Sequence, residues 1–350
     1  MRYLLPLLCL FFVGCSSSDD SPTPTAPQAS SFYVINQGSF YDGIDGSISG
    51  VNVETGEVVS DAFMTQNGVS LGNSPQAGYT FGSTHYIPAF ESNRVWALNS
   101  QNLQIEGTIT TNSPNAVVAT QDFLFVTNND GTLSVYNRSD LSFEKKMEVG
   151  PNPCYMAVSG NELFISISDG YNYDGVYANG FRLARVSLAS LALEEYIEVG
   201  MNPGQLLAAP DGTLVVVCRG DYYMTPSQVY KVNPQTNAST YICDASFITL
   251  QGSKLLAIHS VTDWTTYESV TTYRSYDLGT GQIISDSFIS APLPAAPTAI
   301  QCAPNGEILV MSQISTFDYT SPGFVYRYDS QGNYIAEYTV GTAPCGILFK

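Results

Sequence analysis

The chain has 350 residues with 31 acidic and 13 basic side chains, which give it a net charge of −18 at neutral pH. Because cations are few and form no basic cluster, nucleic acids and anionic phosphates are expected to be poor partners. The acidity is explained by solubility and by repulsion from other anions, and we expect a monomer in solution. With 29 glycines and 19 prolines, the sequence is rich in turn-forming residues.

Residues 1–14 are typical of a secretory signal peptide. Arg2 supplies the positive charge, and residues 4–13 form an apolar stretch that is too short to span a bilayer. The Gly-Cys ending resembles a bacterial lipobox, in which Cys15 becomes the acylated first residue of the mature chain. Phe12 stands where leucine is usual, so an ordinary cleaved signal remains the alternative.

The segment that follows the cysteine is expected to be a flexible tether without a core. It begins with Ser-Ser-Ser-Asp-Asp, which resembles the acidic export tag of Bacteroides-type surface lipoproteins. Serine, proline and threonine dominate the rest of it. We therefore divide the chain into a signal peptide (1–14), an acylated tether (15–31) and a folded part (32–350).

Seven apolar segments recur along the folded part, beginning 39 to 53 residues apart. Each is rich in β-branched or aromatic residues, which predicts a buried strand. They are FYVINQ (32–37), HYIPAF (85–90), LFVTNN (124–129), LFISIS (163–168), LVVVCR (214–219), LLAIHS (255–260) and ILVMSQ (308–313). An alternating strand and a more polar strand follow each segment, and we find no helical period in the chain.

A proline signal precedes each apolar segment after the first, except that the sixth repeat reads CDASFITLQ. Proline is tolerated at the first position of a strand, so it marks an inner strand. Each repeat then has four strands, which is the composition of a propeller blade. The first repeat lacks an inner strand, while 344–350 form a lone one. We predict an all-β, seven-bladed propeller in which this last strand completes blade one and removes the open edge.

Connections between second and third strands share one face of a propeller with the connections that carry the prolines. Blades two and three have short connections, whereas the other five are long: 38–46, 169–180, 220–226, 261–270 and 314–322. Long loops in a compact domain are usually functional or disordered, and aromatic loops are seldom disordered. Because Tyr and Trp are favoured at binding surfaces, this face is predicted to bind a ligand.

Our candidate ligand-binding residues come from these loops and from the exit of one strand. For any single tyrosine, packing of loop against loop is the alternative interpretation. The candidates are Tyr41, Asp42, Tyr171, Tyr173, Asp174, Tyr177, Arg219, Tyr222, Tyr223, Trp264, Tyr267, Phe317, Asp318 and Tyr319.

No motif for catalysis or for a resident cofactor is found. The two histidines, His85 and His259, lie in strands of separate repeats, so no histidine-ligated metal site is expected. The segment 169–175 faintly resembles a calcium loop, but the full spacing and the terminal glutamate are missing, and Asp/Asn-Gly turns explain it better. No nucleophile motif or phosphate loop occurs. A calcium-dependent, lactonase-like hydrolase is the alternative among enzymes.

Taken together, these motifs resemble a known family. The repeated EVGPNP and EVGMNP turns, the opening FYVINQGS and the VNVETGEV turn resemble YncE-like propellers. With the lipobox, the acidic tag and CRGDYYMTPS, they more closely resemble the cobalamin-binding surface lipoproteins of Bacteroides-type bacteria, the BtuG family. The resemblance covers residues 32–350.

The resemblance implies a lipid-anchored, surface-exposed outer-membrane protein that binds cobalamin or related corrinoids and passes them to a TonB-dependent transporter. Cobalamin would be a ligand and not a cofactor, and Arg219 would pair with its phosphate or, alternatively, with Asp221. A glycan- or protein-binding surface propeller that serves another transporter is the alternative function, since Tyr and Trp platforms also suit sugars.

Overall fold

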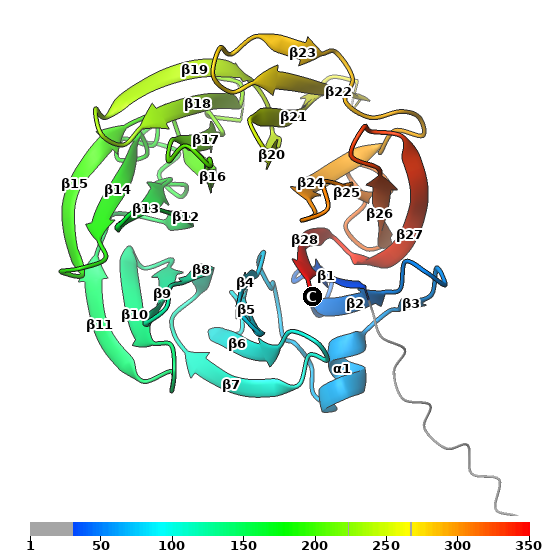
Figure 1. Ribbon diagram of the computed structural model, residues 1–350, viewed down its shortest axis with the longest axis horizontal. Coiled ribbons are helices and arrows are strands. Elements are labelled where there is room, and N and C mark those ends of the chain that lie inside the picture. Colours follow the sequence, from blue (N-terminus) through cyan, green and yellow to red (C-terminus); the bar gives the residue numbers. More distant parts are fainter. Residues whose placement is uncertain (1–30, 223, 267) are drawn as a thin grey trace, which may run out of the picture.

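The computed structural model describes residues 31–222, 224–266 and 268–350. Seven four-stranded antiparallel sheets surround a central axis, so the predicted seven-bladed propeller is confirmed (Figure 1). The predicted signal peptide, the lipidation residue Cys15, the tether up to residue 30, Tyr223 and Tyr267 lie outside the described residues. None of the helices in the described ranges has the length and apolar character needed to cross a membrane.

The first four blades contain fifteen consecutive strands and the closing strand. Blade one contains β1 (Phe32–Asn36), β2 (Ser47–Val51), β3 (Val58–Val59) and β28 (Pro344–Phe349). Blade two contains β4 (Tyr79–Phe81), β5 (Thr84–Ala89), β6 (Arg94–Asn99) and β7 (Ile105–Thr110). Blade three contains β8 (Pro114–Ala119), β9 (Phe123–Asn128), β10 (Thr132–Asn137) and β11 (Phe143–Glu148). Blade four contains β12 (Pro153–Ser159), β13 (Glu162–Ile167), β14 (Arg182–Ser187) and β15 (Ala192–Glu198).

The remaining three blades repeat the same order from the axis outward. Blade five contains β16 (Pro203–Ala208), β17 (Leu214–Cys218), β18 (Gln228–Asn233) and β19 (Ala238–Asp244). Blade six contains β20 (Phe247–Gln251), β21 (Lys254–Asp263), β22 (Glu268–Asp277) and β23 (Ile283–Ser285). Blade seven contains β24 (Ala296–Cys302), β25 (Ile308–Gln313), β26 (Pro322–Tyr328) and β27 (Tyr334–Thr342).

The second strand of each blade contains a continuous apolar run because both of its faces are buried there. In β9, Leu124 and Val126 join a cluster with Tyr86 of blade two. Phe125, which points to the opposite face, joins a cluster with Leu163 of blade four. Alternate residues of one strand therefore pack against the two neighbouring blades, and this is why the sequence shows a continuous apolar run.

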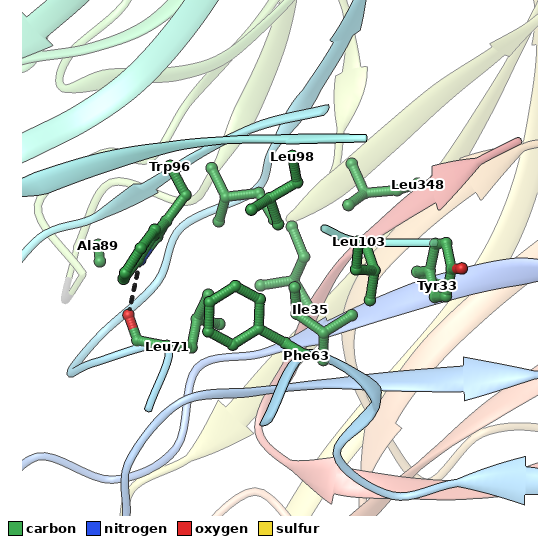
Figure 2. Close-up of a cluster of buried hydrophobic side chains, with 11 residues drawn as sticks. Tyr33, Ile35, Phe63, Leu71, Ala89, Trp96, Leu98, Leu103 and Leu348 are labelled. Carbon is green, nitrogen blue, oxygen red and sulfur yellow. Dashed lines mark hydrogen bonds between the residues drawn. The ribbon is translucent and has the colours of Figure 1, made fainter. Parts of the chain in front are cut away.

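The C-terminal strand closes the ring as predicted. β28 pairs antiparallel with β1, and Leu348 lies opposite Tyr33. Figure 2 shows Leu348 and Ile35 of blade one in the same buried cluster as Leu98 of blade two. The last strand, β28, is thereby joined to the first described strand, β1, through both backbone pairing and side-chain packing.

One helix was missed by the sequence analysis, which found no helical period. Helix α1 (Ala62–Asn67) lies between β3 and β4. The Asp61 carboxylate caps it by accepting a hydrogen bond of 3.0 Å from the Met64 amide, and Gly68 ends it with φ 68°. Its single buried residue, Phe63, packs edge-on against Trp96 with ring centroids 5.2 Å apart. Six residues with one buried side chain are too few to show a period.

Blade six corrects another expectation. The predicted loop 261–270 is mostly strand, because β21 and β22 run past the inner strand of their blade and pair with each other up to Asp263 and Glu268. Only residues 264–266, at the tip, are described as a turn. Blade six therefore carries a projecting hairpin where a loop was expected.

Candidate binding face

The long connections and the proline-bearing connections meet on one face, as the alternation of strand direction requires. The Gln37 amide donates to the Ala343 carbonyl at 2.8 Å, and the Asp169 amide donates to the Pro151 carbonyl at 3.2 Å. In blade five, the Gly220 amide donates to the Met201 carbonyl at 3.1 Å. We call this side of the ring the loop face.

The blade-four loop is organised around one buried carboxylate. Oδ2 of Asp169 accepts hydrogen bonds from the Asn172 side chain and the Asn179 amide, both at 2.9 Å. Tyr177 is only 3% exposed and packs edge-on against Tyr173, with centroids 6.1 Å apart. Tyr177 therefore braces the loop and offers little surface to a ligand.

Three other candidates of this loop face solvent. Tyr171, Tyr173 and Asp174 are all exposed. The distinction from Tyr177 was not visible in the sequence, where all three tyrosines stand in the same run of polar residues and glycines. It arises from the turn geometry, in which Val176 and Tyr177 take positive φ values of 51° and 54°.

The blade-five loop is preformed by a second carboxylate. Oδ1 of Asp221 accepts hydrogen bonds of 2.8 Å from the amides of both Met224 and Thr225. Tyr222 has φ 60°, an uncommon conformation for an aromatic residue, and its side chain is 56% exposed. The turn thus holds Tyr222 outward before any ligand arrives.

The blade-six hairpin and the blade-seven loop contact each other at the rim. Trp264 packs edge-on against Phe317 with centroids 6.1 Å apart, while the hydroxyls of Ser269 and Thr316 are 3.0 Å apart. Trp264 nevertheless remains 59% exposed. These contacts hold the tip of the hairpin against the neighbouring blade.

The other blade-seven candidates differ in role. The Asp318 carboxylate accepts hydrogen bonds from the amides of Thr320 and Ser321 at 3.0 and 2.8 Å, so it shapes its own loop. These bonds favour the charged form and lower the pKa of Asp318. Tyr319 is exposed.

The blade-one candidates lie at the other end of this arc of loops. Tyr41 is 97% exposed and touches Phe40, with ring centroids 5.5 Å apart. The exposed Asp42 accepts a hydrogen bond from the Ser39 hydroxyl. Blades four, five, six, seven and one are consecutive around the ring, so the long connections form one arc, and the short connections belong to the two remaining blades, two and three (Figure 1).

Three of the predicted site residues are brought together around one cavity. Arg219, Tyr222 and Trp264 line a cavity of about 460 Å³ between blades five and six, open to the loop face. The remaining described candidates lie outside its lining. Met224 and Val261 also line it and were missed, although Met224 stands within the loop already singled out.

His259 lines the same cavity, in a strand where the sequence analysis assigned it no role. Burial lowers the pKa of His259, so this side chain is neutral at neutral pH. A neutral imidazole adds one donor and one acceptor to a cavity whose lining also includes Arg219 and several serine and threonine residues.

Arg219 does not form the alternative pair proposed for it. Among the described residues, the ion pairs within 4.0 Å do not include Arg219 with Asp221, whose carboxylate binds backbone amides of its own loop. The guanidinium carbon of Arg219 instead lies 5.9 Å from the centroid of the Tyr155 ring. It faces the axis of the propeller.

Within the described ranges, no three His, Cys, Asp or Glu side chains lie together as a group that could hold a metal ion. The five cysteines after residue 30 are free. Two of them, Cys154 and Cys345, line the central channel.

Comparison with solved structures finds the same fold in several proteins of low identity. Hydrazine synthase of Kuenenia stuttgartiensis aligns with a TM-score of 0.62 and 14% identity, covering 76% of this chain and 86% of that one. A quinoprotein alcohol dehydrogenase-like protein of Bacteroides thetaiotaomicron gives 0.63 and 16%, covering 91% and 77%. AztD of Citrobacter koseri gives 0.56 and 11%, covering 91% and 97%.

Sequence comparisons add no family to this picture. No family model matches the chain, and no curated protein matches it. At identities of 11 to 16%, the similarity to solved structures shows the propeller fold alone, because one fold supports many unrelated functions.

Proposed function

We propose that the protein is an outer-membrane lipoprotein, anchored through Cys15 and exposed at the cell surface, that captures cobalamin or related corrinoids on its loop face. It passes them to a TonB-dependent transporter, touches the membrane only through its lipid, and acts as a binding protein rather than an enzyme. The observation that carries the proposal is the arc of exposed aromatic side chains around the cavity between Tyr222 and Trp264. The similarity of the sequence to the BtuG family supplies the ligand class.

The chemistry of the face suits such a ligand. A corrinoid is large and roughly neutral, with a flat ring system edged by amides. Exposed Tyr and Trp rings can lie against its apolar faces and contribute on the order of 1 kcal/mol each beyond burial. Asp174 and the tyrosine hydroxyls can accept hydrogen bonds from the amide rim, and the hydroxyls can also donate.

The loops are held in place before binding. Asp169, Asp221 and Asp318 each accept hydrogen bonds within their own loops. Because fewer loop and side-chain motions are lost on association, a preformed surface supports tighter binding than a flexible one. This favours high affinity from a modest cavity.

The direct test is co-elution of colour with protein. The purified protein is mixed with cyanocobalamin and run on gel filtration, with calorimetry to follow. We expect red colour in the protein peak and a one-to-one stoichiometry. A colourless peak, with no heat at micromolar protein, would contradict corrinoid capture and would favour a glycan or a protein as the ligand.

Single variants then assign the contacts. Trp264→Ala and Tyr222→Ala each should weaken corrinoid binding by about tenfold or more, which corresponds to ~1.4 kcal/mol. Phe143→Ala is the matched control, because Phe143 is a similarly exposed aromatic residue on the outermost strand of blade three. If all three variants bind cyanocobalamin equally well, the cavity between Tyr222 and Trp264 is not part of the binding site.

A further inference from the structure

The central channel is lined by a repeated position of the sequence. In blades two, three, four, seven and one, the residue directly after the proline of the inner segment lines a channel cavity. These residues are Gln76, Asn115, Cys154, Thr298 and Cys345. All of them are small or polar and uncharged. Blade five has Gly204 at this position.

Arg219 occupies the space that Gly204 leaves. A Cβ atom on Gly204 would lie 2.6 Å from Nε and 2.9 Å from Cζ of Arg219, so a side chain at position 204 would displace the guanidinium from its present position. The backbone of Arg219 is fixed from both sides, because its amide donates to the Asn202 carbonyl at 2.9 Å and its carbonyl accepts from the Ser227 hydroxyl at 3.2 Å. The cation therefore passes over β16 and reaches the axis.

Among the described residues, the lining of the channel cavities around this cation offers no compensating carboxylate. Two channel cavities of about 240 and 260 Å³ are both lined by Arg219, and none of the described residues that line them is Asp or Glu. None of the ion pairs between described residues involves Arg219. Although the chain has a net charge of −18, this partly buried guanidinium faces neutral groups among the described residues that line the two channel cavities.

A guanidinium in this setting is suited to an external anion. Withdrawing a cation from water without a counter-charge is unfavourable, and an oxyanion that accepts two parallel hydrogen bonds offsets that cost. The side chains of Gln37, Gln76 and Tyr155 line the same cavity and offer neutral donors beside the cation. Both channel cavities are smaller than the roughly 300–1,000 Å³ usual for a drug-sized ligand, so they fit one small group.

We propose that the channel mouth at Arg219 is a binding site for a single small oxyanion group, a phosphate, a phosphodiester or a carboxylate. The group is either a free ion or the anionic part of a larger ligand on the loop face, because Arg219 also lines the cavity below Tyr222 and Trp264. The site can be tested without any corrinoid, because its other parts, Gln37, Gln76 and Tyr155, line the channel and not the aromatic cavity.

Calorimetry with inorganic phosphate tests the site in the absence of any corrinoid. Ionic strength is matched with sodium chloride, and acetate and dimethyl phosphate are titrated in parallel to separate carboxylates and phosphodiesters from the free ion. We expect saturable binding of at least one of the three anions. If none of them binds, the proposal is overturned, whatever the outcome with cyanocobalamin.

Two variants and a control assign the binding to Arg219. Arg219→Gln should weaken anion binding at least tenfold, whereas Arg219→Lys should keep part of it, because lysine retains the charge but loses the planar fork. Arg138→Gln is the control, since Arg138 lies in the turn between β10 and β11, on the face opposite the loop face, and should bind as the unmodified protein does. Unchanged affinity in Arg219→Gln would refute the site. If circular dichroism shows that this variant does not fold, unchanged affinity in Arg219→Lys would refute the bidentate contact proposed here.

Discussion

Single residues decide which parts of the loop face are available to a ligand. Tyr171 and Tyr177 lie six positions apart in one loop, yet the first is exposed and the second is buried. Gly204 and Arg219 form a similar pair, since the missing side chain of one gives the other its place. Composition identified the face as aromatic, but backbone conformation sets the role of each side chain.

His85 is the residue whose titration should be visible in stability. It is fully buried in β5, its Nδ1 lies 2.8 Å from the Thr80 hydroxyl, and burial lowers its pKa to about 4. Because the unfolded chain binds this proton near pH 6.5, the free energy of unfolding should fall as pH drops from 6.5 towards 4, by up to about 3 kcal/mol.

Urea unfolding of the unmodified protein and of His85→Gln, at several pH values between 7 and 4, measures this contribution. Carboxylates titrate in both proteins, so the difference between the two isolates His85. Below pH 6.5, we expect the free energy of unfolding of the unmodified protein to fall relative to that of His85→Gln. A difference that is independent of pH would show that His85 gains no proton on unfolding.

At the level of elements, strands with two buried faces could be predicted from the sequence and projecting elements could not. All seven apolar segments are second strands because their runs reflect packing on both sides. Helix α1 and the extension of β21 and β22 leave no such pattern. In the extension, Val261 and Val270 are half or more exposed, so burial imposes no apolar pattern on the surrounding sequence.

Shortening the blade-six hairpin separates its structural role from its binding role. Residues 261–270 are replaced by Asn-Gly, which favours the tight turn that joins paired strands. Ser260 and Thr271, the residues joined, already lie opposite each other with hydroxyls 3.0 Å apart. Because the removed rungs pair mainly with one another, the free energy of unfolding should change by only about 1 kcal/mol.

The same variant should lose most of its affinity for cyanocobalamin, because Trp264 and Val261 leave the wall of the cavity. Thermal melting and calorimetry on one preparation give both results. A large loss of stability would mean that the hairpin supports the blade. Unaltered affinity in a stable variant would place the ligand elsewhere on the loop face.

At the scale of the whole molecule, the ring depends on one strand supplied by the far end of the chain. β28 closes blade one, and without it β1 would present an unpaired edge near the axis. Closure also fixes the positions of blades one and seven, whose loops end the aromatic arc. The shape of the binding face is therefore a property of the closed ring and not of any single blade.

Leu348→Ala tests how much this closure contributes. Leu348 is 1% exposed and packs with Ile35 and Leu98, so its truncation leaves a cavity between blades one and two (Figure 2). The free energy of unfolding should fall by about 2–5 kcal/mol. We expect a single unfolding transition, because the β28–β1 pairing and the buried cluster around Leu348 are lost together. Leu163→Ala, equally buried but within the continuous chain of blade four, is the matched comparison. Guanidinium unfolding measures both variants, and similar losses of stability would mean that the closing strand contributes as much as a strand inside the continuous chain. A loss below about 1 kcal/mol for Leu348→Ala alone would show that the terminal strand adds little to the stability of the closed ring.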